Sequence, residues 1–463
     1  MSSLKVGFSR VNINPPLGIP IDGYFIKRFA KGFLDDLETE VIALSCGDKK
    51  IAVISVDAVR VETLLCNKLY VSIEKATGIS KDGIFITATH THTGPYASLK
   101  EEFYSQEIIA KYTDFLEQRI VDAVTMAFND LKPAKMGYIV GYAPERVAYI
   151  RRYKMKDGTT MTCPPINDPD IDHPIGELDQ RVNVIRFDRE GADSVVIVNY
   201  GLHADTTNGE LISADWPGVM RKTIEKALDG VQAVFLQGCE GDVGSTNVFP
   251  SGGDMNDTEI SFDNEMKSPG MARFVGRALA GTVLQVYDKV NYTDVDEIGI
   301  ISKKILIPSN KPKPEDMPLA RKYLQLHEEG RDAEIPYEAM ELTTVIAKAK
   351  RMCRLENGPE NFEFELTGMK LGEVAFVGIP GEPFTDVGVG IKDTEGWPII
   401  LPCALTNGSE GYFPMMSAYD EGGYEALSSR FKAGVAEKII EESKNLLNEL
   451  KDTSILAERQ QSL

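Results

Sequence analysis

The sequence predicts an α/β fold in which mixed sheets are flanked by helices. Short apolar segments rich in β-branched residues, such as 84–89 and 231–237, have the composition of buried strands. Longer segments, such as 62–76 and 107–131, carry apolar residues at helical spacing. Because the two kinds of segment alternate over the first third of the chain, an α/β sheet is the expected architecture.

The same two patterns place the elements in order. We expect strands at 5–11, 35–44, 51–56, 84–89, 182–187, 194–200, 231–237, 295–308, 362–371, 373–379 and 399–405. We expect helices at 62–76, 107–131, 219–228, 272–287, 317–329, 337–352 and 430–450. Gly47 and Gly372 mark turns between consecutive strands, and Gly78 is placed to end the first helix. Two strongly charged helices predict a helical insertion at about 310–355 on the outside of the protein.

Two long connections lack periodic apolar positions. Residues 143–181 begin with basic residues interleaved with tyrosines and continue with many Pro and Asp, which predicts an extended loop over the sheet. Its arginines Arg146, Arg151 and Arg152 are either solvated surface charges or a cluster that holds an anionic or polar substrate group. The span 250–268 is polar and contains glycine, which is typical of a surface loop or lid.

The composition limits what the protein binds and where it works. The chain of 463 residues carries a net charge of −20, which opposes binding to nucleic acid and to an anionic membrane surface. It contains no apolar run long enough to cross a bilayer, and its first residues lack the apolar core of a signal peptide. The six cysteines are scattered without a CxxC pair, as in proteins with reduced thiols. We therefore expect a cytoplasmic protein with neither a nucleic-acid partner nor a transmembrane segment.

Residues able to bind a metal follow three of the apolar strands. His90 and His92 follow one strand and, being two positions apart, would face the same side. His203 and Glu382 each follow another strand, and strand ends in open α/β sheets are where ligands bind. Two histidines and a carboxylate leave a coordination position for the water of a zinc hydrolase. Taken singly, each residue also fits a hydrogen-bonded position in a core or turn.

A loop of small residues follows the strand at 231–237. It runs from Gly241 to Asn247 and contains Asp242 and Ser245. Its glycines allow the backbone to approach a ligand closely. The loop is therefore expected to form part of the pocket.

Five segments resemble the neutral/alkaline (non-lysosomal) ceramidases and their bacterial relatives, in the order found in that family. They are Ala88-Thr-His-Thr-His-Thr-Gly-Pro95, Asn199-Tyr-Gly-Leu-His203 with Ile212-Ser-Ala-Asp215, Gly241-Asp-Val243, Pro380-Gly-Glu382, and Asn407 to Tyr412. The resemblance implies one zinc ion per chain, with the ligands His90, His203, Glu382 and Tyr412. It also implies hydrolysis of an amide by metal-activated water, with His92 beside the metal or protonating the leaving amine.

The chain departs from the family at two places. The family has Gly-Asp-Val-Ser-Pro-Asn where this chain has Gly-Asp-Val-Gly-Ser-Thr-Asn, so either Ser245 takes the serine's role from the next position or that serine is missing. Family members also add a C-terminal immunoglobulin-like domain, which is not expected here. We therefore expect residues 1–463 to be a single ceramidase-like catalytic domain of the short bacterial kind.

The sequence thus predicts a zinc-dependent hydrolase that cleaves the amide bond of a small N-acylated molecule. We expect His92, Arg146, Asp242 and Ser245 to be catalytic. A second interpretation keeps the metal but assigns ester or lactone hydrolysis, or lyase or isomerase chemistry on a polar, sugar-like substrate. A third is a metal-stabilised binding protein without catalysis.

Overall fold

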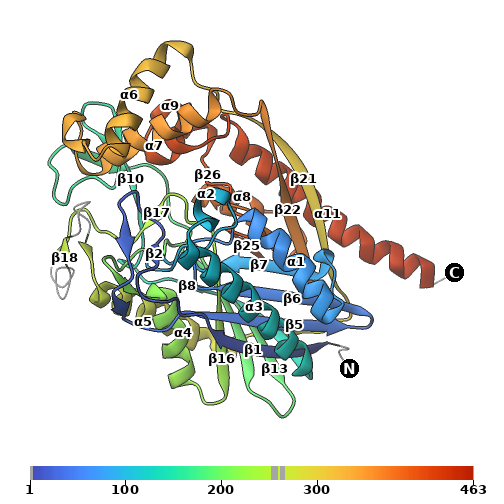
Figure 1. The fold of residues 1–463 in the computed structure, drawn as a ribbon. Helices are drawn as coiled ribbons and strands as arrows, with labels where there is room; N and C mark the ends of the chain where they lie inside the picture. Colours follow the sequence, from blue (N-terminus) through green and yellow to red (C-terminus); the bar gives the residue numbers. More distant parts are fainter. Residues whose placement is uncertain (1–3, 252–258, 261–265, 462–463) are drawn as a thin grey trace.

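Two β-sheets packed face to face form the centre of the protein, and helices cover both outer faces (Figure 1). The structure is a computed structural model that describes residues 4–251, 259–260 and 266–461. Side chains such as Phe85 and Phe187 from one sheet and Met369 and Phe376 from the other share one buried core. The predicted α/β class, with mixed sheets flanked by helices, is confirmed.

The larger sheet has nine strands, and the smaller sheet has four. Across the larger sheet the order is β16 (Val231–Gln237), β14 (Ser194–Tyr200), β13 (Arg181–Arg189), β8 (Lys132–Tyr142), β1 (Lys5–Asn12), β5 (Glu38–Cys46), β6 (Lys49–Val56) and β7 (Ile84–Ala88), with β20 (Asn291–Thr293) beside β8. The order in the smaller sheet is β21 (Ile298–Pro308), β22 (Asn361–Leu371), β23 (Val374–Gly378) and β25 (Ile399–Cys403).

The helices bury their apolar stripes against the outer faces of the two sheets. The larger sheet is covered by α1 (Thr63–Thr77), α3 (Glu107–Asn129), α4 (Asp215–Ala227) and α5 (Pro269–Val286). The smaller sheet is covered by α8 (Thr385–Lys392) and α11 (Val435–Gln461). Of the helices that the structure describes, none is both long and apolar enough to cross a membrane.

The same unit of main elements occurs three times along the chain. Each unit has three antiparallel strands, a helix, a strand parallel to the third strand, and a covering helix. The units are β1-β5-β6-α1-β7-α3, β8-β13-β14-α4-β16-α5 and β21-β22-β23-α8-β25-α11. In the first and third units the second and third strands form a hairpin. Its turn contains Gly47 (φ 60°) in the first unit and Gly372 (φ 57°) in the third, where glycine adopts the left-handed conformation without strain. The sequence shows no internal repeat, so this repetition became visible only in the structure.

The last strands of the three units come together at one end. Although β7 and β16 lie at opposite edges of the larger sheet, Ser55 Oγ on β6 donates a hydrogen bond of 2.7 Å to the Phe235 carbonyl on β16. The segment after β25 joins both edges through Ala404. Its N–H donates to the Gln237 carbonyl (2.9 Å), and its carbonyl accepts from Thr87 Oγ1 (3.0 Å). The residues that follow these strands are therefore close neighbours.

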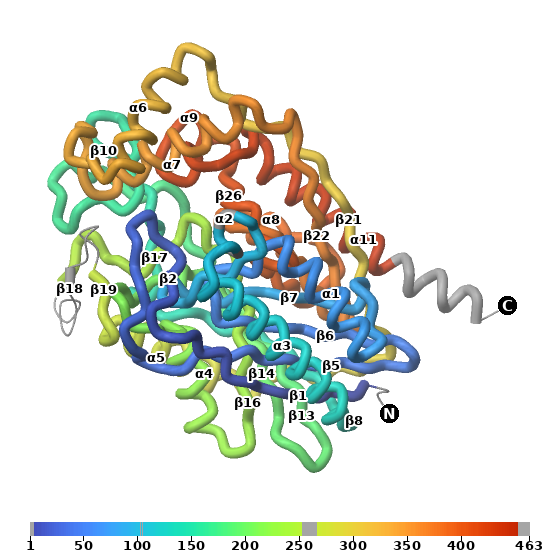
Figure 2. The backbone as a smooth tube through the Cα atoms, in the orientation of Figure 1, coloured from blue at the N-terminus to red at the C-terminus, as the bar shows by residue number. Residues whose placement is uncertain are grey.

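The connection between the first two strands of each unit is long, and the three connections lie around this end (Figure 2). The third connection carries the expected helix pair, α6 (Met317–Glu328) and α7 (Ala339–Leu355). The second was predicted to be an extended loop, and this was wrong. It folds into a small sheet of β11 (Thr160–Thr162), β10 (Arg152–Met155) and β12 (Ile171–Pro174), because Tyr153, Met155 and Ile171 bury a small core with Val248.

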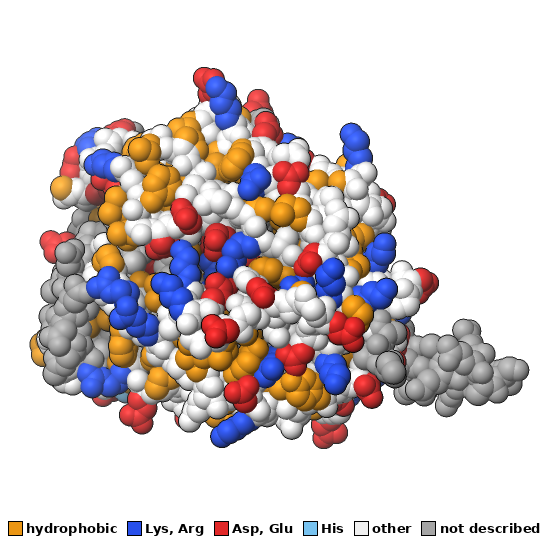
Figure 3. Space-filling view, turned by 90° about the horizontal axis from the view of Figure 1, so that it is seen from below, with side chains coloured by type: hydrophobic (Ala, Val, Ile, Leu, Met, Phe, Trp, Pro, Cys, Tyr) orange, Lys and Arg blue, Asp and Glu red, His pale blue; other side chains and the backbone are white. Residues whose placement is uncertain are grey.

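Short elements complete the chain. The strands are β2 (Pro20–Ile21), β3 (Arg28–Phe29), β4 (Gly32–Phe33), β9 (Tyr149–Ile150), β15 (Leu211–Ile212), β17 (Val243–Gly244), β18 (Glu259–Ile260), β19 (Met266–Lys267), β24 (Glu382–Pro383) and β26 (Tyr412–Phe413), and the helices are α2 (Glu101–Tyr104), α9 (Met416–Glu421) and α10 (Tyr424–Ser428). Most of the lid expected at 250–268 lies outside the described residues. On the face drawn in Figure 3, basic side chains lie among acidic and hydrophobic ones.

Candidate functional site

His90 and His203 turn the same ring nitrogen toward a common point. His90 follows β7, and its Nδ1 lies 2.8 Å from the Val59 carbonyl. His203 follows β14, and its Nδ1 lies 2.8 Å from the Glu240 carbonyl. Because a carbonyl accepts only from a protonated Nδ1, both Nε2 atoms are left as lone-pair donors. His90 also has a left-handed backbone (φ 65°), which is unusual for a residue with a side chain.

Glu382 lies between these two histidines. Its Oε2 is 3.5 Å from Nε2 of His90 and 3.5 Å from Nε2 of His203. Oε2 is buried and has no hydrogen-bond partner among the described residues. A buried carboxylate oxygen between two imidazole lone pairs is the arrangement expected around a cation.

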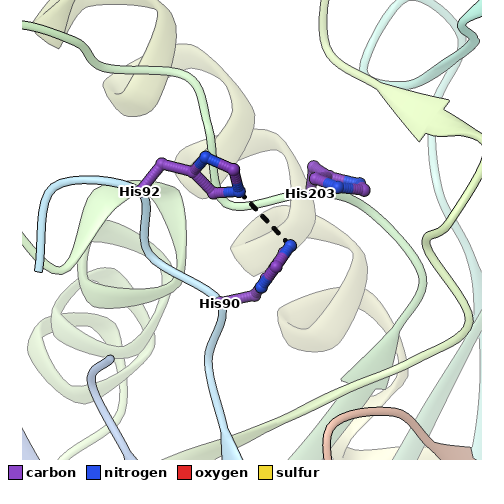
Figure 4. Close-up of side chains that lie close together, drawn as sticks. All are labelled: His90, His92 and His203. Carbon is purple, nitrogen blue, oxygen red and sulfur yellow. Dashed lines mark hydrogen bonds between the residues drawn. The ribbon is translucent and has the colours of Figure 1, made fainter. Parts of the chain in front are cut away.

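His92 completes a group of three histidines whose rings face one another (Figure 4). Its Nε2 is 3.3 Å from Nε2 of His90. Burial, followed by the neighbouring His90 and His203, lowers the pKa of His92 well below its usual value, so the ring is neutral at pH 7. On the other side, Nδ1 faces Asp205 Oδ1 at 3.9 Å. Asp205 in turn pairs with the buried Lys267 (2.6 Å).

Arg151, which follows β9, is the arginine of the second connection that reaches the site. Its Nη1 lies 3.2 Å from His203 Nε2, and its Nη2 donates to the Tyr412 hydroxyl at 3.1 Å. The buried Glu425 fixes the guanidinium from behind, at 2.8 Å from Nε. Arg146, the arginine expected to be catalytic, is exposed and donates to the Ser251 carbonyl (2.9 Å). The structure therefore does not bring Arg146 to the histidines.

Tyr412 is placed beside Glu382 by the short parallel pair β24 and β26, in which these two residues are partners. Burial first, and then the Glu382 carboxylate, raise the pKa of the Tyr412 phenol well above its usual value. The ring of Tyr424 packs against that of Tyr412, with centroids 5.6 Å apart. No pattern in the sequence singles out Tyr424, which lies in the short helix α10.

Glu240, which follows β16, was missed by the sequence analysis. It is fully buried, and neither carboxylate oxygen has a hydrogen-bond partner within the described part of the chain. His90, Glu240 and Glu382 each offer one ligand atom within 4.8 Å of the others. Burial and the nearby Glu382 raise the pKa of Glu240 well above its usual range. The signal that selected His203 and Glu382, a polar residue just after an apolar strand, would also have selected Glu240.

Asp242 and Ser245 lie in the loop after β16 but differ in their surroundings. Asp242 Oδ1 accepts hydrogen bonds from the Thr385 N–H (2.8 Å) and hydroxyl (2.9 Å) at the first turn of α8. Burial raises the pKa of Asp242 to about 6. Ser245 is buried directly after β17. Gly241 passes so close to the Glu382 carbonyl that a Cβ there would lie 2.6 Å from it, so a side chain is excluded.

A cavity of about 880 Å³ opens above the cluster of His90, His92 and Glu382. It is walled by the first connection (residues 20–29), by α7 of the third connection, and by the segments that carry Tyr412 and Tyr424. A volume of this size accommodates a small organic molecule.

The fold and the site together define a four-layer α/β protein with a buried cluster of histidines and carboxylates beneath a cavity. No family model and no curated protein match the sequence. Solved structures do match. The neutral ceramidase from Pseudomonas aeruginosa superposes with a TM-score of 0.72 and 14% identity, over 98% of this chain and 75% of that chain. A ceramidase complexed with C2 superposes with a TM-score of 0.71 and 14% identity, over 98% of this chain and 76% of that chain. The chain therefore has the fold of the neutral ceramidases, as the resemblance of its motifs implied.

Proposed function

We propose that this protein is a metal-dependent hydrolase related to the neutral ceramidases, and that it cleaves the amide bond of a small N-acylated molecule. The observation that carries the proposal is the position of Glu382 Oε2, buried without a hydrogen bond and 3.5 Å from Nε2 of both His90 and His203. The shared fold over nearly the whole chain supports it. Since all three units contribute to one site, residues 1–463 are proposed to act as a single catalytic domain.

The donor set fits a zinc ion. His90, His203, Glu382 and Tyr412 would hold the ion, because two neutral imidazoles and a carboxylate are common zinc ligands and Tyr412 adjoins Glu382. Glu240 is a further oxygen donor within reach of His90 and Glu382. Bound zinc would lower the pKa of a water molecule and polarise the amide carbonyl.

The remaining groups support hydrolysis by moving a proton and stabilising charge. His92 is neutral at pH 7, so it can accept a proton and return it to the leaving nitrogen. Glu425 fixes the Arg151 guanidinium, whose N–H groups point at Tyr412 and His203. The guanidinium would therefore stabilise the negative charge that develops on the carbonyl oxygen of a substrate bound beside these two residues. Asp242 holds the loop of Gly241 against α8 through Thr385, so it positions the pocket wall.

The first test is elemental analysis of protein purified without added metal, followed by assays on N-acyl substrates and their ester analogues. We expect about one zinc per chain and hydrolysis of the amides. A His203→Ala variant should lose both while remaining folded. Metal bound without turnover of any amide would favour esterase, lactonase or lyase chemistry, or a binding role. A chain that takes up no zinc would contradict the proposal.

A further inference from the structure

One wall of the cavity is rich in arginine, although the chain as a whole carries a net charge of −20. Arg351 and Arg354 come from the last turns of α7, and Arg430 comes from the segment before α11. Lys350 lies beside them, with its Nζ 5.8 Å from the centre of the Phe25 ring. We call the three arginines the basic wall. Arg351 and Arg354 belong to the third connection, whereas Arg430 lies between β25 and α11, and none of the three is among the residues that would hold the metal.

The carboxylates that line the same cavity are already engaged. Asp22 pairs with Arg60 (2.6 Å), and Glu62 pairs with Lys100 (2.6 Å). Glu410 pairs with Arg430 of the basic wall, and Glu382 belongs to the proposed metal site. Within the described residues, no ion pair joins Arg351 or Arg354 to a carboxylate. The basic wall therefore has two more positive charges than negative partners.

Arg351 and Arg430 also contact groups that carry no charge. Arg351 donates to the carbonyls of Leu427 (2.9 Å) and Asn310 (2.6 Å), which orient the guanidinium without balancing its charge. The Arg430 guanidinium lies over the Phe362 ring, 4.6 Å from its centre. Burial, and after it the like charge of Arg354, lower the pKa of Arg430 to about 10. Such crowding of like charges costs stability and is relieved when an anion binds between them.

Aromatic side chains line the same cavity as the basic wall. Phe25, Phe103 and Phe362 line the cavity together with Tyr412 and Tyr424. A ligand that fills this space needs a short apolar portion and a negatively charged end. A neutral lipid amide would satisfy the aromatic side chains but would leave Arg351 and Arg354 without a negatively charged partner.

We infer that the basic wall binds a carboxylate carried by the substrate itself, so that the substrate is an amide of modest size with a carboxylate on its amine side or on its acyl side. The inference depends on the proposed amide hydrolysis in one respect, which is that the bond to be cut is an amide at the proposed metal site. Binding of the carboxylate to the basic wall does not depend on it. The guanidinium groups of Arg351 and Arg354 hold the carboxylate, and the amide lies at the proposed metal site.

Matched substrates test the inference with zinc-loaded protein. The first pair tests a charge on the amine side of the amide, with N-hexanoylglycine as the anionic member and N-hexanoylglycinamide as the neutral one. The second pair tests a charge on the acyl side, with adipic acid mono-n-butylamide as the anionic member and N-butylhexanamide as the neutral one. In at least one pair we expect kcat/KM to be roughly ten- to a hundredfold higher for the anionic member. Arg354→Met should abolish that preference by lowering kcat/KM for the anionic member far more than for the neutral member. Since Arg354 is exposed, the variant should fold.

Arg331→Met is the matched control, because it removes a cation from the same insertion but not from the cavity lining. It should keep the preference of the wild-type protein. Equal or faster cleavage of the neutral member in both pairs would overturn the inference while leaving amide hydrolysis in place. If no amide is cleaved, calorimetric titration of the metal-free protein with the two anionic compounds decides. Binding that Arg354→Met weakens at least tenfold would support the basic wall without the proposed function, and no binding would overturn the inference.

Discussion

Arg151 Nη1 lies 3.2 Å from Nε2 of His203, the same nitrogen that faces Glu382. Burial, and then this neighbouring cation, lower the pKa of His203 to about 4. The ring is therefore neutral over the physiological range, which is the form that binds a metal. Arg151 thus contributes twice, by keeping His203 unprotonated and by directing N–H groups at His203 and Tyr412.

Glu382→Gln should weaken zinc binding by at least about a hundredfold, because an amide oxygen carries no charge to balance the cation. Affinity would be measured by competition with a chromogenic chelator. Glu363→Gln, which alters an exposed glutamate paired with Lys304, is the control and should bind zinc like the wild-type protein. Unchanged affinity in Glu382→Gln would exclude this carboxylate as a ligand.

Glu240→Gln should reduce zinc affinity by roughly tenfold and make it less dependent on pH. In the metal-free protein the raised pKa favours the protonated form of Glu240, so binding through this carboxylate is coupled to release of its proton. The proton count comes from calorimetry of zinc binding in buffers with different ionisation enthalpies. The variant should release about one proton fewer than the wild-type protein. The same count in both proteins would place Glu240 outside the coordination sphere.

Stability of the metal-free protein should fall on mild acidification because of His203. Its pKa is about 4 in the folded chain and about 6.5 when unfolded, so the unfolded state binds more protons between these values. The contribution is fully present above about pH 6.5 and is lost as the pH falls toward 4. Between pH 7 and pH 5 this amounts to about 2 kcal/mol. Urea unfolding at both pH values should show a smaller difference for His203→Gln, and an equal difference would contradict the assignment.

The strands and the main candidate metal ligands were predictable because each rests on a local pattern. His90, His203 and Glu382 come just after apolar runs, and such runs form buried strands whose ends share an edge. The turns at Gly47 and Gly372 are equally local. The predicted helix ends were less accurate. The helix expected at 219–228 is α4, which begins at Asp215, because the Asp215 side chain accepts hydrogen bonds from the N–H groups of Thr206 and Thr207 and anchors an earlier start.

The features of the site that were not predictable from the sequence depend on contacts between distant segments. Arg146 and Arg151 have the same chemistry and lie five positions apart. Only the pairing of β9 with β17 turns Arg151, and not Arg146, toward His203. Similarly, Glu240 joins the site because the edges of the larger sheet approach each other. This approach depends on tertiary contacts such as that of Ser55 with Phe235.

Arg151→Gln should lower kcat by about a hundredfold or more while zinc content stays near one per chain, because the guanidinium is placed to stabilise charge and is not itself a ligand. Arg146→Gln is the matched control from the same connection, and its exposed position predicts activity within about threefold of the wild-type value. Similar losses in both variants would contradict the assignment of Arg151.

The Arg151 variant also leaves the buried Glu425 with a weaker partner, at a cost of about 1–3 kcal/mol. The double variant Arg151→Gln/Glu425→Gln separates this effect from catalysis. It should recover thermal stability without recovering kcat, because neutralising Glu425 relieves the buried charge but restores no guanidinium beside His203 and Tyr412. Recovery of kcat together with stability would show that Arg151 acts through the fold alone.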